Sequence, residues 1–337
     1  GQHIGVVEGA AQMPVRGVKN THATSLSTQV GHDKVKAMDN YSSRIAGIVY
    51  GGAAAEAAAI EPEGTEFSTG TQLGLYVADG LLEVLEWASD GQAADPPASV
   101  WLALLRWYKS RYGDFPEGLP AVYDRWIDAY PLGDGDVEDA TKTGLEDVEM
   151  GTPRKPHGQE ATGAEALVRA APFGMIPQVD ADWVIKMSQQ AAVLTHGTWT
   201  TSVAYSLLVH HVLTGKTFLG SVTEVLDRIS EHDAELAEQI RTGLAATVVT
   251  PTTAQQVLTA AIASVADALE QPVAPEQLFA AAVTNAVNHG GNTQATALLA
   301  GQLAGGLLGN TATGTPSHLK NYPVLEELID RWIRLTS

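Results

Sequence analysis

Apolar residues recur at helical spacing along most of the chain. In the stretch from Gln72 to Trp87, for example, Leu73, Tyr76 and Val77 fall on one face of a helix. The long apolar stretches lack the alternation of apolar and polar residues that marks a half-buried strand. We therefore expect an all-α protein of roughly a dozen helices with little or no sheet. The predicted helices span residues 41–59, 72–87, 99–111, 119–130, 164–171, 181–196, 201–213, 222–229, 234–244, 253–269, 275–288, 294–309 and 324–335.

Helix-breaking residues divide these predicted helices. Pro62 and Gly64 end the first of them. Residues 131–162 are rich in Gly, Asp and Thr, and we interpret them as a long irregular connection, a type of loop that is usually either functional or disordered. Residues 1–40 lack a helical period and are interpreted as an N-terminal extension, either native or left over from cloning. Residues 41–337 are expected to form a single helical domain.

The first predicted helix is rich in small residues. Gly47, Gly51 and Gly52 lie among its alanines. Because glycine has no side chain, a second helix can pack closely against these positions. We therefore expect a close helix–helix contact here.

The charge balance narrows the range of partners. The chain has 337 residues, with 20 Lys and Arg against 39 Asp and Glu, which gives a formal net charge of −19. Nucleic acids and anionic membranes attract basic surfaces, so we expect neither as a partner. The absence of Cys excludes disulfides, thiolate metal sites and cysteine nucleophiles. The sequence has no apolar run of about 18 residues. It also has no signal pattern at its start, and we expect a cytoplasmic protein.

A polar turn at residues 286–297 is the strongest candidate site in the sequence. It lies between two runs of small apolar residues. An ordinary helix–helix turn explains its two consecutive glycines and one polar capping residue. Such a turn does not explain His289, Asn292 and Gln294 together, because buried polar groups need partners. We therefore expect these side chains to bind a ligand.

A second polar cluster, residues 68–72, lies where another helix begins. Helix N-termini offer free N–H groups to anions and carbonyl oxygens. Thr69, Thr71 and Gln72 are therefore candidate substrate-binding residues. An ordinary helix cap explains the same residues about as well.

Glu56, Glu61 and Glu63 lie close to the proline that ends the first helix. Glycoside hydrolysis needs a carboxylate to activate water or to stabilise an oxocarbenium-like transition state. These glutamates are therefore candidates for a catalytic acid or base. The alternative is that they are ordinary exposed acids, which is the usual fate of Glu.

Two further polar residues lie in apolar surroundings. His196 ends an apolar helix, a place where histidine more often acts as a structural cap than as a catalyst. We keep it as a candidate substrate-binding residue. Arg169 lies between Val168 and Ala170, and we expect it to pair with a buried carboxylate or to bind backbone carbonyls.

Taken in order, these segments resemble the ADP-ribosylglycohydrolase family, which includes the dinitrogenase-reductase-activating glycohydrolases. Each motif is weak alone, and their common order carries the resemblance. It implies an all-α, orthogonal multi-helix bundle in which the turns converge on an active cleft. The segments that match are residues 44–59, 67–75, 151–153, 163–174, 194–197 and 286–309.

The resemblance also implies two magnesium ions, held by aspartates of an early turn and a late turn. Here Thr69-Gly70 replaces the early Asp-Asp pair, and Asn292-Thr293-Gln294 replaces the late Asp-Thr-Asp. Magnesium prefers hard, mostly charged oxygen ligands. We therefore expect no metal ligands and no cofactor, with magnesium disfavoured by the missing aspartates.

The middle motif departs from the family as well. It is glycine-rich in the family and lies near the diphosphate of ADP-ribose, whereas here it contains Glu165. A negative charge at this place would repel a diphosphate, so we expect Glu165 to contact a different substrate. By the same resemblance, Glu63 stands where many members have a functional Glu, with Glu61 as its rival.

Three functions remain open. The first is a metal-independent glycohydrolase acting on an N-riboside or nucleoside-like small molecule, such as one in a biosynthetic pathway, with Glu63, Glu61 or Glu56 as acid or base. The second is a non-catalytic ligand-binding or regulatory protein on the same scaffold. The third is a magnesium-dependent hydrolase of ADP-ribosylated proteins.

Overall fold

The computed structural model describes residues 41–61, 64–119, 121–245 and 250–336. Within these ranges the regular structure is helical, and strand-type pairing is limited to an isolated bridge between Thr152 and Lys155. The prediction of an all-α fold is confirmed. No helix in the described part of the chain is long and apolar enough to cross a membrane. The predicted N-terminal extension and Glu63 lie outside the described residues.

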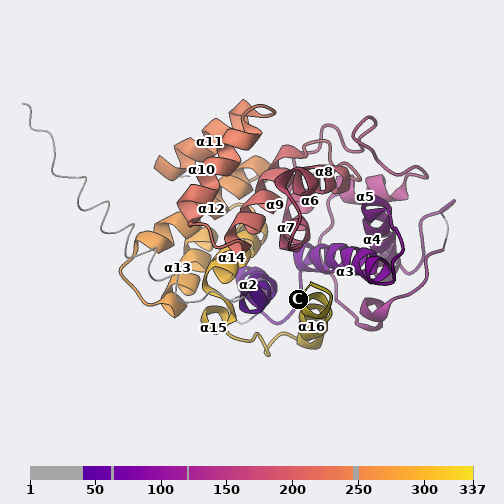
Figure 1. The fold of residues 1–337 in the computed structure, drawn as a ribbon, viewed down its shortest axis with the longest axis horizontal. Helices are drawn as coiled ribbons and strands as arrows, with labels where there is room; N and C mark the ends of the chain where they lie inside the picture. The colour runs from indigo at the N-terminus through magenta and orange to yellow at the C-terminus, as the bar shows by residue number, and fades with distance from the viewer. Residues whose placement is uncertain (1–40, 62–63, 120, 246–249, 337) are drawn as a thin grey trace, which may run out of the picture.

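The helices run in several directions, as Figure 1 shows: α2 is seen nearly end-on, whereas α3 lies across the view. In chain order they are α2 (Tyr41–Ile60), α3 (Thr69–Ser89), α4 (Pro96–Tyr112), η1 (Trp126–Ala129), α5 (Asp139–Glu146), α6 (Glu165–Val168), α7 (Ala171–Met175), α8 (Ala181–Ala192), α9 (Thr200–Leu213), α10 (Phe218–Ile229), α11 (Ala234–Ala245), α12 (Ala254–Glu270), α13 (Pro275–Asn288), α14 (Thr293–Leu308), α15 (Asn310–Thr313) and α16 (Tyr322–Thr336).

The most closely packed helices are α2 and α14, which lie side by side near the middle of the molecule (Figure 1). A Cβ atom added at Gly47 would lie 2.1 Å from the carbonyl oxygen of Gly305. One added at Gly51 would lie 2.5 Å from that of Gly301. The predicted close contact of the first helix is therefore confirmed, and its partner is α14.

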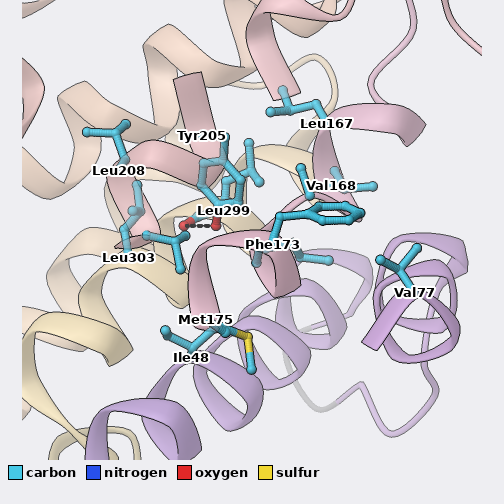
Figure 2. Packing of buried hydrophobic residues seen from close by; sticks show 14 of the residues in the cluster. Ile48, Val77, Leu167, Val168, Phe173, Met175, Tyr205, Leu208, Leu299 and Leu303 are labelled. Carbon is cyan, nitrogen blue, oxygen red and sulfur yellow. Dashed lines mark hydrogen bonds between the residues drawn. The ribbon is translucent and has the colours of Figure 1, made fainter. Parts of the chain in front are cut away.

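Apolar side chains from distant parts of the chain meet around α7. Figure 2 shows Phe173 of α7 in the same buried cluster as Ile48 of α2 and Tyr205 of α9. The Tyr205 hydroxyl lies 2.6 Å from Oε1 of Gln302 and 3.4 Å from the carbonyl oxygen of Leu299, so its one proton serves two acceptors on α14. This core joins α2, α7, α9 and α14.

One predicted helix is wrong. Of the described residues 119 and 121–130, only Trp126–Ala129 are helical, and they form the short 3-10 helix η1. The Nε atom of Arg125 donates to Oδ2 of Asp79 at 2.9 Å, and Nε1 of Trp126 donates to Oδ1 at 2.7 Å. Asp79 is completely buried. Because a buried charge needs partners, these long-range contacts outweigh the helical pattern of the segment.

The predicted irregular connection at residues 131–162 contains a helix, α5. The helix was not evident among the many Gly, Asp and Thr residues of this segment. Its inner face is formed by the buried residues Thr141, Gly144 and Leu145. A Cβ atom at Gly144 would lie 2.8 Å from the carbonyl oxygen of Leu194, so the close packing of this face depends on the glycine.

The helix predicted for residues 164–171 is two short helices, α6 and α7. Pro172 lies in the first turn of α7, where a proline is tolerated because no N–H is needed there. The break between the helices places Arg169 on the inside, with 1% of its surface exposed. Most other predicted helices match within a few residues, although α8 ends at Ala192 and α10 begins at Phe218.

Candidate functional site

A cavity of about 330 Å³ lies where the start of α3, the start of α6 and the start of α14 meet. Its volume falls in the range of about 300–1,000 Å³ that is usual for small-molecule sites. None of its described lining residues is Lys, Arg or His. A larger hollow of about 660 Å³ beside α8 and α10 contains none of the residues predicted from the sequence. The smaller cavity is lined by Glu56, Ser68, Thr69, Gly70, Asp136, Val137, Glu138, Ala164, Glu165, Val168, Gly291, Asn292, Thr293, Gln294 and Ala295.

Glu56 reaches the cavity from α2 and lies against the N-terminus of α3. Its side chain is buried, and its Oε2 accepts a hydrogen bond of 3.0 Å from the backbone N–H of Thr71. Burial raises the pKa of Glu56, although hydrogen bonds from Ser68 and Thr71 oppose the rise. Glu56 therefore takes the place at this helix terminus that an external anion would otherwise occupy.

Gly70 makes this arrangement possible. A Cβ atom at position 70 would lie 2.4 Å from Oε1 of Glu56, so a side chain there would force the Glu56 carboxyl group to move. The carboxyl group of Glu56 thus fills the space of a side chain at position 70. In the family that the sequence resembles, position 70 carries the second aspartate of the early pair.

Thr69 and Gln72 hold the loop that precedes α5. The Thr69 hydroxyl donates to the carbonyl oxygen of Asp136 at 2.6 Å. The Gln72 amide donates to the carbonyl oxygens of Phe67 and Leu132, each at 3.2 Å, and its Oε1 accepts from Nε1 of Trp107. These side chains fix the loop over the cavity, and Gln72 does not line the cavity itself.

The fixed loop brings Glu138 into contact with α6. One Glu138 oxygen accepts from the backbone N–H of Ala164 at 2.8 Å, and the other accepts from that of Glu165 at 3.4 Å. In return, Oε1 of Glu165 accepts from the backbone N–H of Glu138 at 2.9 Å. A Cβ atom at Gly163 would lie 2.0 Å from Oε2 of Glu138, so a side chain at that position would displace the Glu138 carboxyl group. Both carboxyl groups are therefore held in place by backbone amides.

A chain of hydrogen bonds leads from Arg169 to Glu138. Arg169 donates to the Thr195 hydroxyl at 2.7 Å, and that hydroxyl lies 2.7 Å from Nδ1 of His196. Arg169 can only donate, and we assign the hydroxyl proton to Nδ1 as the acceptor within reach. We therefore assign the remaining ring proton to Nε2, which donates to Oε2 of Glu138 at 2.8 Å. Burial holds the pKa of His196 below its usual value and so favours this neutral form.

Arg169 is the buried cation behind this network. Burial lowers its pKa to about 10, while the carboxyl groups of Glu165 and Glu138 oppose that change. The guanidinium also donates to the carbonyl oxygen of Ala191 at 3.3 Å. The expectation that Arg169 binds a backbone carbonyl is therefore confirmed.

Glu138 and Glu165 differ in their pKa values. Burial disfavours the charge of Glu138, but hydrogen bonds from His196 and the backbone outweigh it and hold the pKa of Glu138 below its usual range. Burial raises the pKa of Glu165 to about 7, with the Thr141 hydroxyl opposing the rise and the charge of Glu138 adding to it. Near neutral pH, Glu138 is ionised and Glu165 is protonated part of the time.

The late turn contributes fewer ligand-facing groups than its sequence suggests. Gly290 and Gly291 have φ values of 70° and 62°, as expected for a turn that ends a helix. The Oδ1 atom of Asn292 accepts from the backbone N–H of Ala295 at 3.2 Å and caps α14. Asn292 and Gln294 line the cavity, and His289 does not. The turn is thus partly an ordinary helix cap and partly a cavity wall.

The remaining sequence candidates are distributed as follows. Glu56, Thr69 and Glu165 line the cavity, and His196 reaches it through Glu138. Glu61 is exposed and does not line it. Thr71 lines a separate small pocket of about 30 Å³ beside α7.

The sequence analysis missed Glu138 and Thr195. Glu138 belongs to a polar segment without helical period, and its partners are 26 to 58 positions away in the chain. The one usable signal was the length of that segment, because long connections are often functional.

The donor groups present do not fit the pair of magnesium ions that the resemblance implies. The Thr69 hydroxyl and the Asn292 amide are neutral groups that also form hydrogen bonds with Asp136 and Ala295, and Gly70 has no side chain. Within the described ranges, no group of three or more His, Cys, Asp or Glu residues is arranged to hold a metal ion. Neutral and already bonded oxygens are poor replacements for the carboxylates that magnesium prefers.

Comparisons with known proteins agree with the fold. Among solved structures, one described as an ADP-ribosylglycohydrolase-related protein complex is similar, with a TM-score of 0.65 and 20% sequence identity. The similarity covers 89% of this chain and 100% of that chain, and at this identity it shows a shared fold. No curated protein sequence matches. The family model for ADP-ribosylglycohydrolase matches residues 37–337. Because that match spans most of the sequence, the chain belongs to the ADP-ribosylglycohydrolase family.

Proposed function

We propose that the cavity hydrolyses an N-riboside, or another nucleoside-like small molecule, that carries no diphosphate. The observation that supports this most is the lining itself, with the carboxyl groups of Glu56, Glu138 and Glu165 and no basic side chain among the described lining residues. Proteins bind phosphates with Arg, Lys or free amides at a helix N-terminus. The amide of Thr71 at the start of α3 is already bonded to Glu56.

In this proposal Glu138 is the base and Glu56 is the acid. The raised pKa of Glu56 favours its protonated form, which can give a proton to the leaving nitrogen. The C1′–N bond then breaks, and its electron pair stays on that nitrogen. Water adds to C1′ and gives its proton to ionised Glu138, which also stabilises the positive charge that develops on the sugar. Glu61 lies outside the cavity, and Glu63 lies outside the described residues, so neither is assigned a role.

The other polar residues would bind or position. Gln294 is the exposed amide on the cavity wall and is suited to sugar hydroxyls. Thr69 holds the loop that carries Glu138, and His196 and Arg169 orient Glu138 from behind. No step of this mechanism requires a metal ion.

The proposal is tested by measuring release of free base from a set of phosphate-free ribosides in excess EDTA. Turnover should persist in EDTA, and Glu56→Gln should lower kcat on neutral ribosides by about 10²–10⁴-fold, the usual contribution of a general acid. Glu160→Gln, which removes an exposed carboxylate outside the cavity, is the matched control.

Other outcomes would favour the alternatives. Binding without release of base from any riboside would favour a ligand-binding protein on the family's scaffold. Cleavage of ADP-ribosyl-arginine that depends on added magnesium would favour an ADP-ribosyl-protein hydrolase.

A further inference from the structure

The charge around the cavity indicates a narrower class of ligand. The acidic residues Glu56, Asp136, Glu138 and Glu165 all line it, and no described lining residue is basic. The nearest buried cation is Arg169, which does not line the cavity and donates to Thr195 and Ala191. The negative charge of Glu138 therefore has no cationic side chain opposite it in the cavity.

Glu165 adds an unused acceptor to the same wall. Only 7% of its surface is exposed, and its Oε1 accepts from the backbone of Glu138. Its Oε2 is buried, and no hydrogen bond of good geometry reaches it within the described part of the chain, although the Thr141 hydroxyl lies near enough to lower the pKa of Glu165. The nearby Thr141 hydroxyl is likewise without a partner of good geometry. A buried carboxyl oxygen in this state is costly, and a positive charge in the cavity would reduce the cost.

We propose that the cavity selects N-ribosides whose leaving group is positively charged, such as a quaternary pyridinium-type heterocycle. This inference rests on the proposed function, because the same carboxyl groups serve recognition and hydrolysis. A positive ring placed beside Glu138 and Glu165 gains attraction that a neutral ring of the same shape does not.

A cationic leaving group also fits the carboxyl groups of the cavity, because its departure needs no proton from them. When the C1′–N bond breaks, its electron pair moves to the ring nitrogen and cancels the positive charge. The heterocycle therefore leaves as a neutral molecule without taking a proton from Glu56. Water adds to C1′ and gives a proton to Glu138, so the products are ribose, the neutral heterocycle and one proton.

The test compares two probes of nearly the same shape by calorimetric titration of the full chain in EDTA. Nicotinamide riboside carries a positive ring, and its dihydro form carries a neutral one. The cationic probe should bind at least ~10-fold more tightly. Glu165→Gln should reduce this ratio severalfold, and Glu160→Gln should leave it unchanged, because Glu160 is exposed and outside the cavity.

The affinities of the wild-type protein for the two probes are enough to test the inference. The test therefore does not depend on whether a variant folds. Equal affinity for both probes, tighter binding of the neutral probe, or no binding of the cationic probe would overturn the inference. Its failure is distinct from that of the proposed function. Preferential binding without hydrolysis would support charge recognition only, and hydrolysis of both probes with equal affinity would support the hydrolase only.

Discussion

Glu138 owes its position and its charge to residues far from it in sequence. Its oxygens accept from the amides of Ala164 and Glu165 and from the His196 ring. None of these partners belongs to the loop that carries Glu138. A residue held this way is suited to a fixed chemical role, because its geometry does not depend on a flexible side chain alone.

Glu138→Gln tests that role directly. The substitution keeps the shape of the side chain but removes its charge, so the proposed base and its stabilisation of the sugar cation are both lost. We expect kcat for riboside hydrolysis to fall by about 10²–10⁴-fold, with a smaller change in KM. Steady-state kinetics beside the Glu160→Gln control measure this. An unchanged kcat in Glu138→Gln would remove Glu138 from the mechanism.

Glu165 should make stability depend on pH. Its pKa is raised from 4.5 in the unfolded chain to about 7 in the folded protein. Between these values the folded state binds more protons than the unfolded state, so stability falls as pH rises through the interval. The free energy of unfolding should fall by up to about 3 kcal/mol across this interval. The Glu165→Gln variant should not show this fall. Denaturant titrations of both proteins at several pH values measure the difference, and a difference that stays constant with pH would contradict this.

At the scale of elements, the contact between α2 and α14 carries the wall on which Glu56 sits. A Cβ atom at Gly301 would lie 2.3 Å from the carbonyl oxygen of Gly51, so any side chain there separates the two helices. Their separation would also displace the start of α14, which forms another wall of the cavity. The glycines are therefore part of the support of the site.

Gly301→Ala should destabilise the protein by about 1–3 kcal/mol, because it overpacks this contact. The matched control is Gly74→Ala on α3, where the nearest atom to an added Cβ is 4.0 Å away. Since Ala favours a helix over Gly, that control should be neutral or stabilise by up to about 1 kcal/mol. Equilibrium unfolding in denaturant compares them, and equal effects of the two substitutions would contradict the role of the α2–α14 contact.

Local patterns in the sequence predicted most of the helices. They failed where contacts between residues far apart in the sequence determine the local structure. The glycines of α2 correctly indicated a close helix contact, because close packing requires small residues whatever the partner. Residues 119–130 have an apolar pattern, yet Arg125 and Trp126 donate to buried Asp79, and of the described residues in this range only 126–129 form a short helix. No feature of residues 119–130 themselves encodes that contact.

The site was predicted in part for the same reason. Glu56 and Glu165 lie in segments whose order resembles a known family, and both line the cavity. Glu138 lies in a polar connection, and its partners Ala164 and His196 are brought to it only by the fold. Thr69 and Gln72 were expected to contact a substrate, but their polar atoms hold the loop before α5.

At the scale of the whole molecule, the family scaffold is kept while the chemistry of its cleft differs. The chain belongs to the ADP-ribosylglycohydrolase family, and its fold is similar to that of a solved structure over 89% of its length. The turns that hold magnesium in the family now carry neutral groups. Glutamates of α2, α6 and the loop before α5 supply the carboxyl groups of the cavity. This combination is the basis for proposing a substrate without phosphate.

The most direct test of that proposal compares nicotinamide riboside with its 5′-monophosphate under the same conditions in EDTA. The two share the same cationic ring and differ only in the phosphate group. We predict that kcat/KM for the riboside exceeds that for the monophosphate by at least ~10-fold, because the acidic cavity has no group to neutralise a phosphate. Equal or faster hydrolysis of the monophosphate would contradict the proposed preference for a substrate without phosphate.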